Sequence, residues 1–302
     1  MSITVAGAPV SFGVFELTPD DVEVALPDAE GIATILHRTG YRGIDAGPVG
    51  LLGRGDDLLS LLNRHELELC GGWVDLPFSD DAAFAAALPA LDDALGVFAT
   101  AAAADPVRRP LPTLADSGDA RRRANPGGAP GLSLDEAGWD RFARNLAIVA
   151  TRVRDLGLEP TFHHHACTFV ETPAEIDAFL ARTDVDLTFD TGHLLIGGGD
   201  PVDGWRRWHD RINHLHLKDV RVQRVRDIVA RKGGMIDVWS GGAFAPLGQG
   251  DLDIAGFMDL VTADGYDGWL VVEQDLYPQP GYDLAAVERD HVANREALRR
   301  WA

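Results

Sequence analysis

The sequence predicts an α/β protein of the eight-stranded (β/α)8 barrel type, a TIM barrel, built as a single domain over residues 1–302. Short apolar or β-branched runs alternate with helical patterns about eight times along the chain. Strands separated by single helices pair in parallel. An open doubly wound sheet would also satisfy this alternation. Eight strand–helix pairs in 302 residues favour the barrel, which typically takes about 250 residues, and no G-x-G-x-x-G follows the first strand.

The first half of the chain carries four of these pairs. The predicted strands are 3–13, which runs into a loop, 41–48 and 67–76, and a fourth that either GVFATAAAA or PLPTL supplies. The predicted helices are 29–39, 55–65, 81–95 and 134–156. Pro89 is a point at which the third helix would split. Ser133 is the expected N-cap of the fourth helix, with Glu136 in the capping-box position.

The second half carries the other four pairs. The predicted strands are 158–165, 185–190, 212–219 and 268–275, and the predicted helices are 173–182, 201–209, 252–263 and 283–300. Two segments interrupt the rhythm, 116–133 and 220–250, and both are rich in glycine. We expect them to be active-site or surface loops, with arginines 121–123 on the solvated surface.

The charge balance excludes several kinds of partner. The chain has 27 Lys and Arg against 47 Asp and Glu, a net charge of −20. Such a chain repels nucleic-acid phosphates and anionic membrane surfaces. No apolar run of about 18 residues predicts a membrane span, and no secretory signal is recognisable. Two cysteines suit a reducing compartment, so we expect a cytoplasmic protein with a small-molecule substrate, and the sequence is compatible with a homo-oligomer.

Polar groups gather at the strand ends of the second half, where barrels place catalytic groups. The strand 158–165 ends in His163, His164 and His165. Side chains alternate along a strand, so His163 and His165 share one face and His164 takes the other. Three histidines at the end of an apolar strand favour a functional site over a packed cluster.

The next strand and its neighbour continue this pattern. Asp190 ends the strand in DLTFDTGH, and His193 follows within a tight turn. In INHLHLKD, His214, His216 and Lys218 share one face. Burying such groups is costly unless they are paired or bound to a metal.

The last strand, GWLVVEQD, places Glu273 after a run of apolar residues, with Asp275 on the same face. Asp190, His216 and Glu273 therefore form a nitrogen and oxygen ligand set on adjacent strands, and His163 or His165 would complete it. Without thiolates the set suits Mn²⁺, Co²⁺, Fe²⁺, Mg²⁺ or a catalytic Zn²⁺. Such an ion polarises a carbonyl or binds vicinal hydroxyls.

Other catalytic sets find little support. The chain has no G-x-S-x-G, no Walker lysine motif and no H-E-x-x-H. Cys167 follows the three histidines, but we expect it to be a small packed residue and not a nucleophile.

The motifs H-x-H-x-x-T, D-T-G-H, H-L-H-L-K-D, P-L-G-Q-G and G-W-L-V-V-E-Q-D together resemble the xylose-isomerase-like barrel superfamily of sugar isomerases and epimerases. Within it the chain is most similar to the inosose dehydratases of myo-inositol catabolism. The resemblance covers most of the chain and is weakest over 80–135. It implies a divalent metal, most simply Mn²⁺ or Co²⁺, held by Asp190, His216 and Glu273. His163 stands where the isomerases have a glutamate that serves as ligand and base, which disfavours epimerisation and favours the dehydratases.

The resemblance implies a lyase that removes water from a cyclic polyol ketone through an enediolate. His163 or His193 would take the α-proton. Lys218 would stabilise the enediolate oxygen, or else form an ion pair with Asp190 or Asp219. The expected substrate contacts are His165, His214 and Asp275. The alternatives are a sugar isomerase or epimerase, a 3-keto-glycoside lyase, or a non-catalytic metal-binding subunit; a nuclease is disfavoured by the charge.

Overall fold

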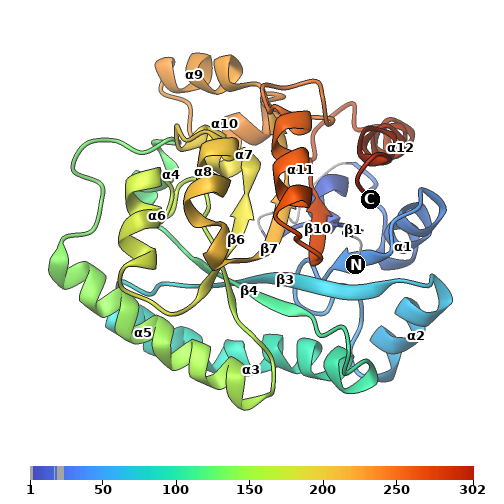
Figure 1. The fold of residues 1–302 in the computed structure, drawn as a ribbon, viewed down its shortest axis with the longest axis horizontal. Coiled ribbons are helices and arrows are strands. Elements are labelled where there is room, and N and C mark those ends of the chain that lie inside the picture. The colour runs from blue at the N-terminus through green and yellow to red at the C-terminus, as the bar shows by residue number, and fades with distance from the viewer. Residues whose placement is uncertain (1–2, 17, 19–23) are drawn as a thin grey trace.

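Eight parallel strands close into a barrel with helices around it (Figure 1). The computed structural model describes residues 3–16, 18 and 24–302. The barrel strands are β1 (Thr4–Gly7), β2 (Gly43–Asp45), β3 (Glu68–Leu76), β4 (Leu111–Asp116), β5 (Thr161–His163), β6 (Asp186–Asp190), β7 (Ile212–Leu217) and β10 (Trp269–Val272). Around the barrel they follow the order β1-β10-β7-β6-β5-β4-β3-β2, so the predicted fold class is confirmed.

Helices cover the outside of the barrel. They are α1 (Ala29–Arg38), α2 (Asp56–Arg64), α3 (Asp81–Ala104), α4 (Ala120–Arg123), α5 (Glu136–Asp155), α6 (Pro173–Leu180), α7 (Thr191–Ile196), α8 (Pro201–Trp208), α9 (Val222–Ala230), α10 (Met235–Ser240), α11 (Ile254–Ala263) and α12 (Leu284–Leu298). Two short 3-10 turns, η1 (Pro9–Phe12) and η2 (His209–Arg211), and a two-stranded sheet of β8 (Asp219–Val220) and β9 (Phe244–Ala245) complete the described elements.

The main hydrophobic core lies between the strands and the helices. Phe162 of β5 stacks on Phe179 of α6 with ring centroids 4.3 Å apart, and Phe189 of β6 stacks on Phe257 of α11 at 5.8 Å. Because side chains alternate along a strand, an outward Phe162 turns its neighbour His163 toward the barrel interior. Packing of this outer layer therefore fixes which side chains face the site.

Several local predictions were wrong. Pro89 lies inside a continuous helix, α3, which also contains GVFATAAAA, so the fourth strand comes from PLPTL. The N-cap of α5 is Asp135, whose carboxylate accepts from the Gly138 N–H at 2.8 Å. Ser133 instead donates to Glu175 at 2.7 Å. The helix is therefore capped by the carboxylate of Asp135, two residues after the serine hydroxyl that was predicted to cap it.

Helix α3 also departs from the prediction that no segment is suited to span a membrane. By length and by a mean hydropathy of 1.5 it is long and apolar enough to do so. In the barrel it packs against β3, β4 and α5, with Phe84, Leu91 and Phe98 buried. This packing buries 33% of the apolar 18-residue window of the helix.

Segment 220–250 is not an irregular loop. It contains α9 and α10, which lie together at one end of the molecule in Figure 1. The chain enters and leaves this excursion through the antiparallel pair β8 and β9, where Val220 lies opposite Phe244. Its apolar residues Ile228, Met235 and Val238 belong to a small cluster that also includes Cys167 and Ile196 outside the excursion. The excursion forms a cap that packs on the loops at this end of the barrel.

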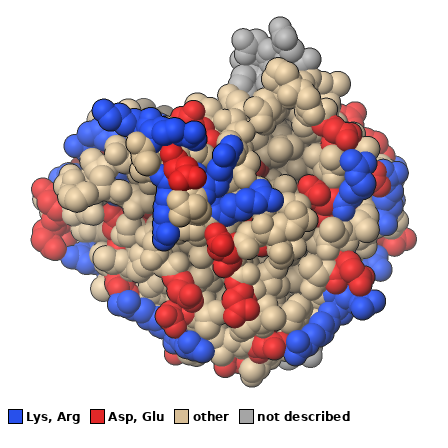
Figure 2. Space-filling view, turned by 90° about the horizontal axis from the view of Figure 1, so that it is seen from above, with Lys and Arg blue, Asp and Glu red and all other residues tan. Residues whose placement is uncertain are grey.

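Segment 116–133 contains α4, and one of its arginines contradicts the prediction of a solvated surface. Arg122 is 1% exposed. Its guanidinium donates to both carboxylate oxygens of Glu175, at 2.9 and 2.8 Å, and to the Thr168 carbonyl, and it lies 3.2 Å from Glu171. This buried ion cluster fastens the segment to the start of α6. Elsewhere charges of both signs are interspersed over the surface seen in Figure 2.

Replacing Arg122 by Met is expected to lower the free energy of unfolding by about 3–5 kcal/mol, because it leaves two buried carboxylates without their cation. The matched control is Arg121→Met, whose side chain is 67% exposed and is expected to change stability by less than about 0.5 kcal/mol. Urea unfolding of both variants measures the difference. Equal losses in the two would contradict a stabilising role for the cluster.

Candidate active site

A cavity of about 910 Å³ opens at the carboxyl ends of the barrel strands. Its lining includes His163, His165, His216, Lys218, Glu273 and Asp275. The cap contributes Met235 and Trp239, and segment 116–133 contributes Ser117 and Arg123. Six of the polar residues that the sequence places at the strand ends are therefore brought to one cavity, whereas Asp190, His193 and His214 do not line it.

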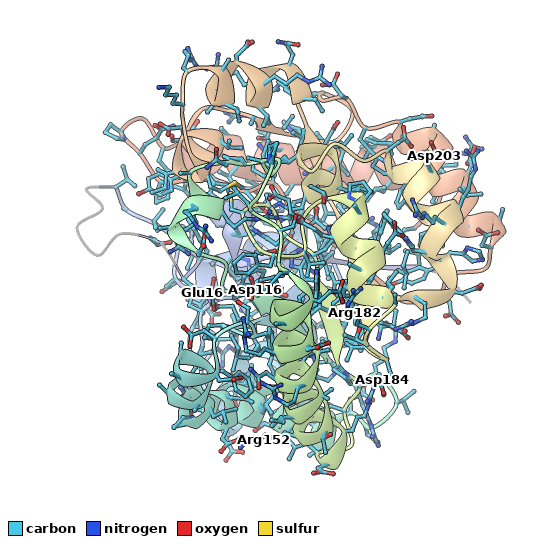
Figure 3. The ribbon with its side chains drawn as sticks, turned by 90° about the vertical axis from the view of Figure 1, so that its left-hand side faces the viewer. Glu16, Asp116, Arg152, Arg182, Asp184 and Asp203 are labelled. Carbon is cyan, nitrogen blue, oxygen red and sulfur yellow. The ribbon has the colours of Figure 1, made fainter. Side chains whose placement is uncertain are left out.

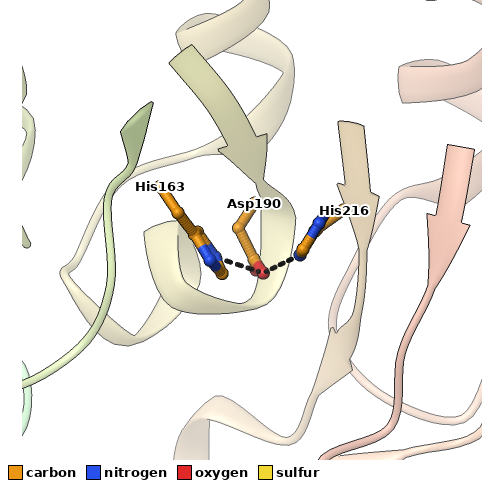
Figure 4. Close-up of side chains that lie close together, drawn as sticks. All are labelled: His163, Asp190 and His216. Carbon is orange, nitrogen blue, oxygen red and sulfur yellow. Dashed lines mark hydrogen bonds and ion pairs between the residues drawn. The ribbon is translucent and has the colours of Figure 1, made fainter. Parts of the chain in front are cut away.

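Asp190 lies at the centre of the candidate metal ligands (Figure 4). Its Oδ2 is 3.1 Å from His163 Nε2 and 3.8 Å from His216 Nδ1. Ligand atoms from these three buried residues all lie within 4.8 Å of one another. Glu273 adjoins this group, with Oε2 2.9 Å from His216 Nδ1.

The D-T-G-H motif fixes the position of the Asp190 side chain. Asp190 ends β6 and is also the N-cap of α7, because its Oδ1 accepts from the His193 N–H at 2.9 Å. Thr191 Oγ1 both donates to the Lys218 carbonyl and accepts from the Lys218 N–H, which ties α7 to the end of β7. Gly192 must lack a side chain, since a Cβ there would lie 2.5 Å from Lys218 Cβ. One short motif thus sets Asp190 and Lys218 side by side.

Lys218 is buried among acidic groups. Its Nζ lies 3.3 Å from Asp190, 3.0 Å from Glu273 and 2.9 Å from Asp275, and it donates to His193 Nε2 at 3.0 Å. Burial opposes the charge, but the three carboxylates outweigh it and hold the pKa of Lys218 well above its usual range. Of the two predicted ion-pair partners, Asp190 is confirmed and Asp219 is not.

Asp219 has a structural role instead. Its carboxylate accepts from the N–H groups of Gly248, Gly250 and Leu252 at 2.8–3.0 Å. It therefore anchors the P-L-G-Q-G loop beside the site.

The donor set fits a divalent ion. Nδ1 of His163 and Nε2 of His216 are buried without a hydrogen-bond partner among the described residues, whereas Oε2 of Glu273 and Oδ1 of Asp275 lie within 3.0 Å of Lys218 Nζ. Burial opposes the protonation of His216, but Glu273 beside its Nδ1 raises the pKa of the ring. Nitrogen and carboxylate oxygen ligands without a thiolate suit Mn²⁺, Co²⁺, Fe²⁺ or Zn²⁺. Asp190, His216, Glu273 and His163 are the residues that would hold it.

The remaining histidines differ in their access to the cavity. His165 is half-buried and lines it, and its Nδ1 donates to the Ala166 carbonyl at 2.7 Å, which leaves Nε2 as an acceptor. Burial and then Lys218 lower the pKa of His165 to about 3, so the ring is neutral at pH 7. His193 has no exposed surface and lies behind Lys218 and His165. The geometry therefore disfavours His193 as the proton acceptor.

His214 does not line the cavity, contrary to the predicted substrate contact. It lies two residues before His216 on the inward face of β7, with ring centroids 5.2 Å apart, in a deeper layer of the barrel. The ring fits there because Gly71 faces it: a Cβ at Gly71 would lie 3.3 Å from His214 Nε2. Cys167 lines the cavity, but burial raises the pKa of its thiol, in keeping with a packed residue.

Sequence reasoning missed five acidic residues that also line the cavity: Glu16, Asp237 and three at or near strand ends. Asp45 ends β2, Asp116 ends β4, and Asp75 lies one residue before the end of β3. The same signal, an acid at the end of an apolar strand, marks each of them in the sequence. The uncertain position of the fourth strand concealed Asp116.

Burial raises the pKa of Asp116 to about 7, although its Oδ2 accepts from the Gly118 and Phe169 N–H groups. The folded protein therefore keeps this proton up to about pH 7, whereas the unfolded chain releases it near pH 4. Stability is lost as the pH rises through that window, by at most about 1.4 kcal/mol per pH unit for one proton.

Replacing Asp116 by Asn is expected to remove this contribution, so the variant gains stability relative to the wild type between pH 4.5 and 6.5. Urea unfolding at several pH values measures the difference. The control is Asp140→Asn at an exposed position of α5, which should follow the wild type. A constant offset between Asp116→Asn and wild type over the window would contradict the raised pKa.

Comparison with known proteins gives a consistent result. A family model described as xylose isomerase-like TIM barrel matches residues 36–300. The rhizopine catabolism protein MocC of Rhizobium meliloti is 33% identical over 309 residues, covering 96% of this chain and 87% of that protein. An inosose dehydratase of Lacticaseibacillus casei is 38% identical over 152 residues, about half of either chain. The chain thus aligns with only half the length of that relative.

A solved structure of an IolI protein with a bound zinc atom superimposes with a TM-score of 0.71 over 99% of both chains. Its sequence identity of 12% supports the shared fold alone.

Proposed function

This chain belongs to the xylose isomerase-like TIM barrel family, and from that membership we propose that it is a metal-dependent lyase that removes water from a cyclic polyol ketone of the inosose type. The observation that carries the proposal is the convergence of Asp190, His216, Glu273 and His163, of which His163, His216 and Glu273 line the cavity and Asp190 lies directly behind them. The inosose dehydratase relative supports a dehydratase, and we favour it over an epimerase because His163 stands where the resemblance to the isomerases places a glutamate base. We place the enzyme in the cytoplasm, in keeping with two free cysteines.

The proposed ion is Mn²⁺ or Co²⁺, and the zinc atom of the IolI neighbour supports a divalent ion in general. Once bound, it would supply the positive charge that acidifies the C–H beside a substrate carbonyl. His163 and His216 would bind the ion through ring nitrogens. Glu273 stays ionised: burial opposes this, but His216 and Lys218 hold its pKa well below the usual range.

His165 is the proton acceptor in this proposal. Its Nε2 carries a free lone pair because Nδ1 is committed to the Ala166 carbonyl, and the ring lines the cavity. It takes the α-proton, the electrons of that C–H bond form the new C=C bond, and the adjacent C–O bond breaks. The imidazolium then returns the proton to the departing hydroxyl, which leaves as water. Lys218 holds a fixed positive charge beside the developing enolate.

The reaction is tested by incubating the Mn²⁺- or Co²⁺-reconstituted protein with 2-keto-myo-inositol in deuterated buffer, with a chelated sample beside it. Proton NMR and ultraviolet absorbance should report metal-dependent loss of water and an enolisable dione. Exchange of the α-proton without dehydration would instead support an isomerase, an epimerase or a 3-keto-glycoside lyase. Neither exchange nor dehydration, with the metal bound, would refute the proposed substrate class, and failure to bind any metal would indicate a non-catalytic protein.

His165→Gln is expected to lower kcat about 10²- to 10⁴-fold and to abolish exchange of the α-proton, with a smaller effect on KM. Glutamine keeps a polar side chain of similar reach but cannot accept the proton. His209→Gln, at an exposed position, is the control. If the His165 variant exchanges the α-proton at the wild-type rate, another group is the base.

A further inference from the structure

His164 is the member of the three-histidine run that faces away from the cavity. It is fully buried and does not line the cavity, whereas His163 and His165 do. Phe162, two residues earlier and on the same face of the chain, stacks on Phe179 of α6. Helix α6 covers this outer face, on the side of the molecule that faces the viewer in Figure 3. His164 therefore belongs to the outer layer of the barrel wall and does not face a substrate in the cavity.

The imidazole of His164 accepts a hydrogen bond from the backbone of a proposed metal ligand. The Asp190 N–H donates to its Nε2 at 3.1 Å. Pairing between β5 and β6 ends at His163 and Thr188, so the Asp190 N–H lies two residues beyond the last paired residue of β6. Asp190 is fully buried, and a buried N–H without an acceptor is costly. The side chain of His164 thus takes the place of a strand carbonyl that β5 no longer offers.

Packing alone does not account for a histidine at this position. The ring of His164 packs edge-on against Phe189 of β6, with centroids 5.8 Å apart. A neutral imidazole has one donor and one acceptor nitrogen, so acceptance at Nε2 puts the proton on Nδ1. Nδ1 is buried and has no hydrogen-bond partner among the described residues. Because an apolar side chain could make the same packing without a buried, unpaired N–H, the bond to Asp190 is what the imidazole adds.

The bond to His164 holds the main chain from which both Asp190 oxygens project. Oδ1 accepts from the His193 N–H, and Oδ2 lies 3.1 Å from His163 and 3.3 Å from Lys218. A shift of the main chain at the end of β6 would move Oδ2 relative to the other proposed ligands. It would also move the first turn of α7, which Asp190 caps.

We propose that His164 is a positioning residue for the metal site: by accepting the Asp190 N–H, it holds Asp190 Oδ2 beside His163 and His216. The inference rests on the proposed function for the role of Asp190 as a ligand, and it adds a residue that lies outside the ligand set. His164 acts only through Asp190, since its ring is separated from the cavity by the barrel wall.

The test compares His164→Gln with His164→Met. The two new side chains have the same length, but only glutamine carries an amide oxygen that can accept the Asp190 N–H. His164→Met is expected to weaken Co²⁺ binding about 10- to 100-fold, the usual effect of removing a residue that orients a metal ligand. His164→Gln should stay within about threefold of the wild type. Competition with a chelating dye measures the affinity, and visible absorption reports the geometry around the bound Co²⁺.

His291→Met is the matched control. His291 is also buried and also bonds to the backbone, at the Val287 carbonyl, but it lies on α12 and outside the proposed ligand set. The control should lose stability without a change in Co²⁺ affinity. Wild-type affinity in His164→Met, equal weakening in His164→Met and His164→Gln, or an equally large loss in His291→Met would each overturn the proposal.

A measurement on the metal-free wild type decides the case in which neither variant folds. The ¹⁵N shifts of the His164 ring should show a proton on Nδ1 and none on Nε2, and the Asp190 N–H should exchange slowly with solvent deuterium. A wild type that binds Co²⁺ but carries the proton on Nε2 would overturn the positioning role and leave the metal site standing. A wild type that binds no Co²⁺ would overturn the proposed function, and the positioning role with it.

Discussion

Asp190→Asn is expected to lower the rate of dehydration by about 10³-fold or more and to prevent the protein from retaining its metal. Asp190 Oδ2 lies within 4.0 Å of His163, His216 and Lys218, and it is the oxygen that joins the two histidines. Loss of several kcal/mol of charge stabilisation corresponds to a rate loss of this size. Asparagine can still cap α7 through its carbonyl oxygen, so the fold should survive.

The measurement is kcat/KM for 2-keto-myo-inositol together with metal content after dialysis. Asp186→Asn is the matched control, because Asp186 starts the same strand and pairs with Arg211 away from the site. A variant that keeps one metal ion per chain and more than a tenth of the activity would show that Asp190 is not a ligand.

Lys218→Met is expected to lower the stability of the metal-free protein by about 3–5 kcal/mol, because three buried carboxylates lose their shared cation. Mn²⁺ should restore part of this loss, since the ion would replace the missing positive charge near Asp190 and Glu273. The wild type should gain less from the same concentration of Mn²⁺.

The chain offers a natural control in its only other lysine, the exposed Lys232. Lys232→Met should change stability by less than about 0.5 kcal/mol with or without metal. Urea unfolding with and without Mn²⁺ measures all three proteins. If Mn²⁺ stabilises Lys218→Met no more than it stabilises the wild type, Lys218 does not act together with the metal site.

The proximity of the proposed metal ligands was predictable from the sequence because the signal is local. Asp190, His216 and Glu273 each follow an apolar run at a strand end, where an unpaired polar group is costly to bury. The proposal of His165 as the base, in place of His163 or His193, could not be made from the sequence, since it depends in part on α7, a helix directly after β6 that puts His193 behind Lys218.

Long-range partners decided the other differences. Arg122 sits in a run of three arginines that has the local pattern of a solvated surface. It is buried because Glu171 and Glu175, some fifty residues later, form its ion cluster. The Ser133 hydroxyl donates to Glu175 of the same cluster instead of capping α5 as expected. The acids at Asp75 and Asp116 become a pair only once β3 and β4 are adjacent in the barrel.

The paired strands β8 and β9 have a consequence for how this enzyme can diversify. Because Val220 and Phe244 lie opposite each other, the chain leaves the barrel and returns to it at nearly one point. The 23 or so residues between them form the cap and supply Met235 and Trp239 to the cavity, and the cap packs on Cys167 and Ile196 outside it. The single point of attachment allows the cap to be exchanged or resized while the candidate site residues on β5, β6, β7 and β10 keep their positions. New substrates would be acquired by replacing the cap, with the chemistry inherited unchanged.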